Sequence, residues 1–117
     1  MSPRDDRARL LDIVAAARNI QDFVAGVDPE SFRSDKKTQC AVQHQIMLIG
    51  EAAKLLSSEF RDRHIEIPWA PIARMRDKLI HGYADVDLDL IWKTAVESVP
   101  ELLVDLESLL PGDEEKP

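Results

Sequence analysis

Residues 74–83 read Arg-Met-Arg-Asp-Lys-Leu-Ile-His-Gly-Tyr and gather charged and proton-transferring side chains at helical spacing. Asp77 and His81 are four residues apart, so on a helix they share one face, where the carboxylate can orient the imidazole and favour its protonated form. Arg76 lies about 100° round the helix from Asp77, within reach of the same patch. Gly82 favours the end of the helix, because glycine readily adopts the left-handed conformation found there. The simpler interpretation of Asp77 and His81 is an exposed ion pair at a helix C-terminus.

The residue types in this stretch suit a phosphodiester ligand. Such a ligand needs a cation beside its non-bridging oxygens and an imidazole that moves protons, which Arg76 and His81 supply. Arg74 and Lys78 are candidates for further phosphate contacts, although ordinary surface positions explain both equally simply. Tyr83, the only tyrosine of the chain, follows the histidine by two residues and is a candidate member of the same site.

The spacing of Arg76, His81 and Tyr83 resembles the R-x4-H-x-Y motif of HepT-like toxins in the HEPN superfamily. The R-x4-H spacing alone arises by chance in many proteins, whereas its combination with the flanking stretches, in order, is specific. The similarity covers residues 8–110. The flanking stretches that agree are Ile-Gly-Glu-Ala-Ala (49–53), Pro-Trp (68–69), Val-Asp (86–87) and Ile-Trp (91–92).

This resemblance implies an all-α, four-helix, up-and-down-like bundle with a short extra helical turn. It also implies a ribonuclease that acts as a homodimer, in which the motif-bearing helices pair and two copies of Arg76 and His81 share a cleft. Asp77 stands where many HEPN proteins carry asparagine. An aspartate can still orient the histidine, but it adds negative charge beside a phosphate site.

The resemblance further implies a partner, a nucleotidyltransferase antitoxin of the MNT type, which joins the toxin in a complex and transfers AMP to the motif tyrosine, here Tyr83. A competing hypothesis is a non-catalytic subunit that binds nucleotide or substrate for a two-component nucleotidyltransferase, in which Arg76 and His81 hold a phosphate without cleaving RNA. A third is a purely structural interaction module, for which the helix face at residues 50–53 is suitable.

No cluster of carboxylates at metal-ligand spacing occurs in the sequence, which disfavours two-metal cleavage of a phosphodiester. We therefore expect neither a metal nor another cofactor. A metal-free route uses the RNA 2′-hydroxyl as nucleophile and leaves a cyclic phosphate. It requires a base and an acid, which the two copies of His81 in a dimer would provide.

The 117 residues and their composition predict one domain over residues 1–110, followed by an acidic, disordered tail over residues 111–117. No apolar run is long enough to span a membrane. The charged N-terminus lacks an apolar segment of signal-peptide type, and the single Cys40 can form no internal disulfide. We therefore expect a cytoplasmic protein, in which Cys40 is a small apolar helix residue.

The net charge of −7 at first disfavours RNA as a ligand. However, residues 85–117 hold ten acidic residues and two lysines, whereas residues 1–84 have a net charge of +1. Bases gather near the motif, which allows local phosphate contacts even though long-range attraction of RNA would be weak.

Apolar residues at three- and four-residue spacing predict four helices joined by short connections. Phe32 should close one end of the bundle, Trp69 and Trp92 should anchor its core, and Pro100 should kink the last helix. Gly50 suggests close approach of another helix, from the same chain or from a second subunit. The expected helices cover residues 5–24, 34–60, 69–82 and 88–110, with a helical turn at 28–32 and a polar connection at 61–68. Gly26 should end the first helix, Asp28 should cap the helical turn, and Asp87 should cap the last helix.

Overall fold

The computed structural model describes residues 3–82 and 86–110, and of residues 3, 4, 75, 76 and 78–82 the backbone alone. The described residues form helices and no strand, which confirms the all-α prediction. The elements are α1 (Pro3–Val24), α2 (Pro29–Ser34), α3 (Lys36–Leu55), α4 (Ser58–Arg63), α5 (Trp69–Gly82), α6 (Leu88–Lys93), the π-helical η2 (Thr94–Ser98) and α7 (Val99–Glu107).

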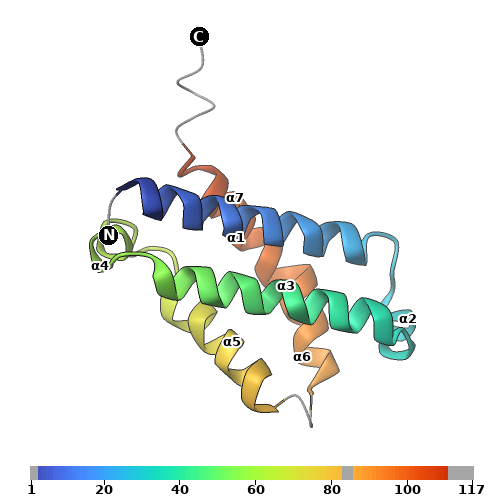
Figure 1. Cartoon of the computed structure of the whole chain (residues 1–117). Coiled ribbons are helices and arrows are strands. Elements are labelled where there is room, and N and C mark those ends of the chain that lie inside the picture. The colour runs from blue at the N-terminus through green and yellow to red at the C-terminus, as the bar shows by residue number, and fades with distance from the viewer. Residues whose placement is uncertain (1–2, 83–85, 111–117) are drawn as a thin grey trace.

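The long helices α1 and α3 lie side by side and form the centre of the bundle, with α7 packed on α1 and α5 packed on α3 (Figure 1). The segment α6–η2–α7 passes behind this pair, and α2 and α4 lie at opposite ends of α3. The predicted four-helix arrangement is thus present, with α6, η2 and α7 forming the fourth helical segment. Burial of each large apolar side chain contributes about 1.5–3 kcal/mol to folding. The largest fully buried residues are Phe32, Ile13, Ile20, Leu56, Ile91, Leu106, Val14 and Val42.

The connection after α1 follows the sequence prediction closely. Gly26 has a φ of +75°, a conformation that residues with a Cβ adopt rarely. Asp28 caps α2 by accepting a hydrogen bond of 2.7 Å from the backbone N–H of Ser31. Phe32 is fully buried at the end of the bundle, where its ring centroid lies 5.1 Å from that of Trp92. Local turn chemistry therefore directs one large aromatic side chain into the core.

The second long helix ends earlier than predicted. It stops at Leu55 rather than near Phe60, and a further helix, α4, spans the end of the predicted helix and the start of the predicted polar connection. The reason lies in Ser57, whose hydroxyl accepts a hydrogen bond from the N–H of Phe60 and caps α4. Asp6 of α1 accepts hydrogen bonds from the N–H and the hydroxyl of Ser57, at 2.8 and 2.7 Å. A contact between residues far apart in the sequence thus sets this helix boundary.

The last helical segment contains an irregularity that the sequence predicts only in part. Its N-cap, Asp87, is as predicted and accepts a hydrogen bond from the N–H of Leu90. Pro100 has no N–H to donate, and the turn that precedes it is π-helical, with the N–H of Val99 bonded to the carbonyl of Thr94 five residues earlier. The last helix ends at Glu107 rather than near residue 110.

Cys40 lies on α3, as predicted, at an exposed position. Within residues 3–82 and 86–110, no helix combines the length and the apolar character that crossing a membrane requires. The predicted acidic tail, residues 111–117, lies outside the described part of the chain.

The Asp6–Ser57 contact should be important for stability. Asp6 is 4 % exposed, and its removal would leave the two partly buried donors of Ser57 without their acceptor. We expect Asp6→Ala to lower the free energy of unfolding by about 2 kcal/mol. Urea titration monitored by circular dichroism measures this change. Asp12→Ala, at an exposed position of the same helix, is the matched control and should change stability by less than about 0.5 kcal/mol. Equal stabilities of the two variants would contradict the importance of the contact.

The helix caps should make stability depend on pH. The backbone N–H of Ser31 holds the pKa of Asp28 below its usual value of 3.8, and the hydroxyl of Thr38 does the same for Asp35. Since both pKa values are lower in the folded state, the caps stabilise the fold above pH 3.8, and this stabilisation is lost as the pH falls through the lowered values. Asparagine also caps helices but does not titrate. The Asp28→Asn/Asp35→Asn double variant should therefore lose less stability than the wild type between pH 5 and pH 3 in urea titrations. An equal or larger loss would contradict this origin of the acid sensitivity.

Candidate functional site

The helix that carries the motif begins at a well-anchored position. The indole N–H of Trp69 donates a hydrogen bond of 3.0 Å to the backbone carbonyl of His64, and its ring lies against that of Phe60. Trp69 is 7 % exposed, which confirms its prediction as a core anchor. Pro71 occupies the first turn of α5, where a missing N–H costs no hydrogen bond. The N-terminal end of the motif helix is thereby fixed to α4.

The backbone of α5 includes Arg76, Asp77 and His81 and ends at Gly82. The predicted helical spacing of the motif is therefore confirmed, and Asp77 and His81 are about one turn apart on the same helix face. The predicted contact between their side chains stays a prediction, as do the roles of Arg76 and Lys78, because the side chains of Arg76, Lys78 and His81 are outside the described set. Tyr83 lies outside the described residues altogether.

Asp77 forms an ion pair that the sequence analysis did not anticipate. Its Oδ1 lies 2.6 Å from Nζ of Lys54, which is in the last turn of α3. The two side chains are 42 % and 41 % exposed. Ion pairs with this much solvent contact contribute about 0–1 kcal/mol to stability, so the main consequence of the pair is the local charge at the motif.

The position of this pair explains an earlier observation about Gly50. Gly50 is buried and lies one turn before Lys54 on the same face of α3, the face that meets α5. α5 of the same chain packs on α3 and is one neighbour that fits the expectation for Gly50. In the sequence, the position of Lys54 four residues after Gly50 was the only indication that this lysine faces another helix. That spacing could not identify Asp77 as its partner, because Asp77 lies 23 residues further along the chain.

Arg74, the other cation predicted near the site, is exposed on α5. Trp92 is partly buried and packs against the core through Phe32, as predicted. Neither the exposure of Arg74 nor the packing of Trp92 shows that the residue binds a ligand. Among the residues that the structure describes, no group of three or more His, Cys, Asp or Glu side chains is arranged to hold a metal ion.

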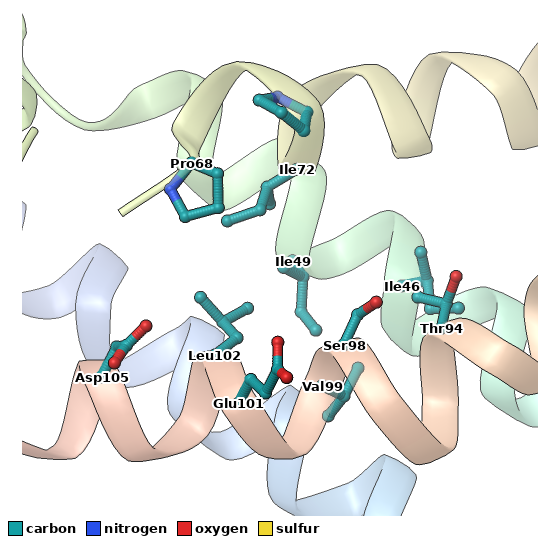
Figure 2. Close-up of a pocket in the computed structure, with 11 residues that line it drawn as sticks. Ile46, Ile49, Pro68, Ile72, Thr94, Ser98, Val99, Glu101, Leu102 and Asp105 are labelled. Carbon is teal, nitrogen blue, oxygen red and sulfur yellow. The ribbon is translucent and has the colours of Figure 1, made fainter. Parts of the chain in front are cut away.

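A pocket of about 280 Å³ lies between α3, α5 and the η2–α7 segment. Figure 2 shows its apolar floor, to which Ile49, Ile72 and Leu102 contribute, with the carboxylates of Glu101 and Asp105 on α7. Its described lining contains no lysine, arginine or histidine. The charged groups among its described lining residues are both carboxylates, so this pocket is unsuited to an RNA phosphate.

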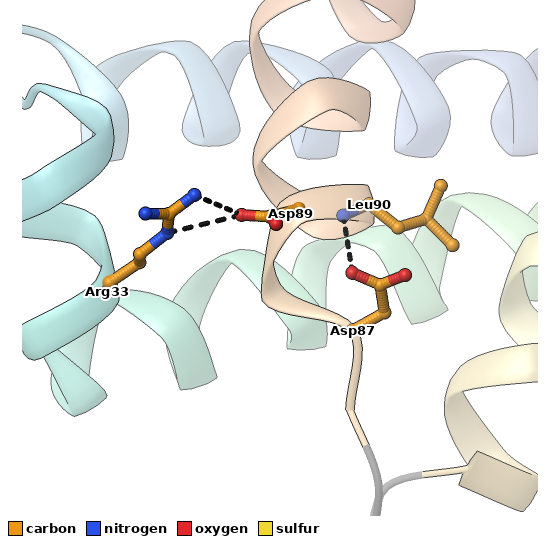
Figure 3. Close-up of polar contacts among 4 residues, drawn as sticks. All are labelled: Arg33, Asp87, Asp89 and Leu90. Atoms are coloured by element: carbon orange, nitrogen blue, oxygen red, sulfur yellow. Dashed lines mark hydrogen bonds and ion pairs between the residues drawn. The ribbon is translucent and has the colours of Figure 1, made fainter.

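Asp87 and Asp89, at the start of α6, both accept hydrogen bonds. Asp87 caps α6, with its Oδ1 3.0 Å from the backbone nitrogen of Leu90. Two residues later, Asp89 accepts hydrogen bonds of 3.2 and 2.7 Å from Nε and Nη2 of Arg33 on α2 (Figure 3). The motif helix on one side and this capped helix start on the other therefore bracket the position of Tyr83 in the chain.

The chain resembles several known proteins over most of its length. A protein of Thermococcus cleftensis named "Probable ribonuclease HepT" is 44 % identical over 106 residues, which cover 91 % of this chain and 96 % of that protein. "Putative RNase MJ0127" of Methanocaldococcus jannaschii is 37 % identical over 110 residues, covering 94 % of this chain and 91 % of the relative. "Putative RNase TTE0752" of Caldanaerobacter subterraneus is 41 % identical over 87 residues, covering 74 % and 78 % respectively.

No solved structure matches the chain. The model of one protein family, described as "Ribonuclease HepT-like", matches residues 13–109, a range that includes α5 and the whole motif. Together with the identities to the named relatives, this match shows that the chain belongs to the HepT-like ribonuclease family.

Proposed function

We propose that this chain is a metal-independent endoribonuclease and the toxin of a toxin–antitoxin pair of the type II/VII-like kind. The observation that carries the proposal is the presence of Arg76 and His81 on the single helix α5, in a chain of the HepT-like family. The names of the relatives support RNA as the substrate, and the chemistry of an arginine with a histidine supports cleavage of a phosphodiester.

The proposed cleavage transfers the phosphoryl group within the RNA. One His81 takes the proton of the 2′-hydroxyl as its oxygen attacks the adjacent phosphorus. A second His81 donates a proton to the departing 5′-oxygen, so the products are a 2′,3′-cyclic phosphate and a free 5′-hydroxyl. Arg76 stabilises the additional negative charge on the phosphorane. The base ends protonated and the acid deprotonated, so the two histidines exchange roles before the next turnover.

This mechanism requires a homodimer, because each chain contributes one motif histidine. Of the other two histidines, His64 packs against Phe60 and its carbonyl accepts the hydrogen bond from Trp69, so it has a structural role. His44 is exposed on α3, away from the motif in sequence. A two-fold dimer that pairs the α5 helices would bring two copies of Arg76 and His81 to one cleft.

We further propose that a nucleotidyltransferase antitoxin neutralises the toxin. The phenol oxygen of Tyr83 attacks the α-phosphorus of ATP, the phenol loses its proton and pyrophosphate leaves, so Tyr83 becomes an AMP ester. Tyr83 follows His81 by two residues, so the attached phosphate would lie near the site and give Arg76 a competing anion.

Replacement of either motif residue should abolish RNA cleavage. We expect Arg76→Ala and His81→Ala to lower the cleavage rate at least 100-fold, the contribution typical of a general acid or base. The assay follows a labelled single-stranded RNA with excess EDTA present, and the wild type should retain its rate there and leave cyclic phosphate ends. His44→Ala is the matched control and should keep wild-type activity. Cleavage that stops in EDTA would contradict a metal-independent mechanism.

Expression in cells separates the toxin from the competing binding-subunit hypothesis. A nuclease should arrest growth when the wild type is induced without its partner, whereas equally expressed Arg76→Ala and His81→Ala variants should not. Absence of arrest by the wild type would favour a non-catalytic subunit of a nucleotidyltransferase. Equal arrest by all three proteins would place the toxicity outside the motif.

Tyr83 should be the site of AMP transfer. With the cognate nucleotidyltransferase and radiolabelled ATP, the wild type should become labelled and lose nuclease activity, because the AMP ester competes with RNA for the cleft. Tyr83→Phe removes only the hydroxyl and should remain active but unlabelled. Since this is the only tyrosine of the chain, labelling of the variant would assign the modification to another residue type.

A further inference from the structure

We propose that Lys54 is a supporting cation of the RNA site, which neutralises Asp77 and keeps the motif face of α5 available to phosphate. The inference rests on the proposed ribonuclease function and extends the site from α5 to α3. Lys54 acts through Asp77 rather than on the reacting atoms, so it is a positioning residue.

The geometry places Lys54 at the motif. Lys54 is in the last turn of α3, and its Nζ lies 2.6 Å from Oδ1 of Asp77. Asp77 is the residue directly after Arg76 and lies about one turn before His81 on α5. Both members of the pair keep about two fifths of their side chains in contact with solvent, so an approaching polyanion would experience their charges.

The charge of Asp77 explains why the site needs this lysine. A carboxylate without a neutralising cation would repel RNA phosphates and would compete with them for the guanidinium of Arg76. An ammonium group 2.6 Å from the carboxylate cancels most of its field at the distance of a bound phosphate. The pair as a whole is neutral, so Asp77 adds no net negative charge to the basic residues of the motif.

A structural role is the competing explanation, since Lys54 also joins α3 to α5. The solvent contact of the pair argues against a large effect on folding. The two explanations make opposite predictions for a protein that lacks both charges. If Lys54 neutralises Asp77, removing the carboxylate restores the site, whereas if Lys54 holds the helices together, the second substitution cannot restore it.

The experiment compares Lys54→Met, Lys54→Arg, Asp77→Asn and the Lys54→Met/Asp77→Asn double variant. The value of kcat/KM is measured on a single-stranded RNA oligonucleotide, and thermal unfolding shows that each variant folds. Lys37→Met, an exposed lysine at the opposite end of α3, changes the net charge equally and is the matched control. RNA binding is also measured in a His81→Ala background over a range of salt concentrations, which gives a readout that does not need cleavage.

We expect Lys54→Met to lower kcat/KM roughly fivefold and to weaken RNA binding similarly at low salt, as for one partly screened unit charge near a phosphate. Lys54→Arg and Lys37→Met should remain close to wild type. The double variant should recover the activity and binding of Asp77→Asn alone. A double variant as impaired as Lys54→Met, or wild-type behaviour of Lys54→Met, would overturn the inference.

The same data separate this inference from the proposed function. A wild type that binds RNA in a Lys54-dependent manner but does not cleave it would overturn the nuclease and support the role of Lys54. A wild type that cleaves RNA equally well with methionine at position 54 would support the nuclease and overturn the role of Lys54. A chain that neither binds nor cleaves RNA would overturn both.

Discussion

The packing of α3 between α1 and α5 is the constraint on which the rest of the structure depends. One face of α3 buries apolar residues against α1, and the face that contains Gly50 and Lys54 meets α5. Within the described residues, α5 packs chiefly on α3 (Figure 1). The motif helix therefore takes its position largely from α3, while Trp69 fixes its N-terminal end to α4.

Two tertiary contacts hold the ends of this arrangement. Asp6 on α1 binds Ser57 at the start of α4, which directs the chain out of α3 and towards the beginning of α5. At the other end, Arg33 on α2 binds Asp89 on α6, the helix that follows α5 in the chain. A partly buried contact before α5 and an exposed ion pair after it therefore connect the flanking segments to α1 and α2.

Local signals in the sequence were sufficient for much of the fold. The cap at Asp28, the burial of Phe32, the cap at Asp87 and the helix that carries the motif were all predicted, since turn chemistry and apolar periodicity act over a few residues. The end of α3 was not predicted correctly, because it depends on an aspartate 51 residues away in the sequence. Long-range pairs of this kind have no local signature.

The same distinction applies to the candidate site. The spacing within residues 74–83 indicated the chemistry, because helical periodicity relates residues on one helix. The contribution of Lys54 was missed, since a lysine near the end of an amphipathic helix resembles any surface lysine until the partner helix is placed. Side-chain contacts within the motif itself stay predictions from this periodicity.

The pocket between α5 and α7 shows how charge is divided over the molecule. Its acidic side chains, Glu101 and Asp105, belong to the C-terminal part of the chain, where most of the net negative charge lies. The cations Lys54 and Arg74 belong to the helices that meet at the motif. A chain that is acidic overall can therefore still present a local surface suited to a polyanion, while its acidic part disfavours binding of RNA elsewhere.

The Lys54–Asp77 pair also has a consequence for how such sequences diverge. A member of the family with asparagine at the position of Asp77 has no carboxylate to neutralise there. Its residue equivalent to Lys54 therefore need not be a lysine for that purpose. Once an aspartate is present, loss of the lysine removes the ammonium group that pairs with it. Positions 54 and 77, which are 23 residues apart, should therefore change together during evolution. The lysine should be present before the RNA site can accept an aspartate.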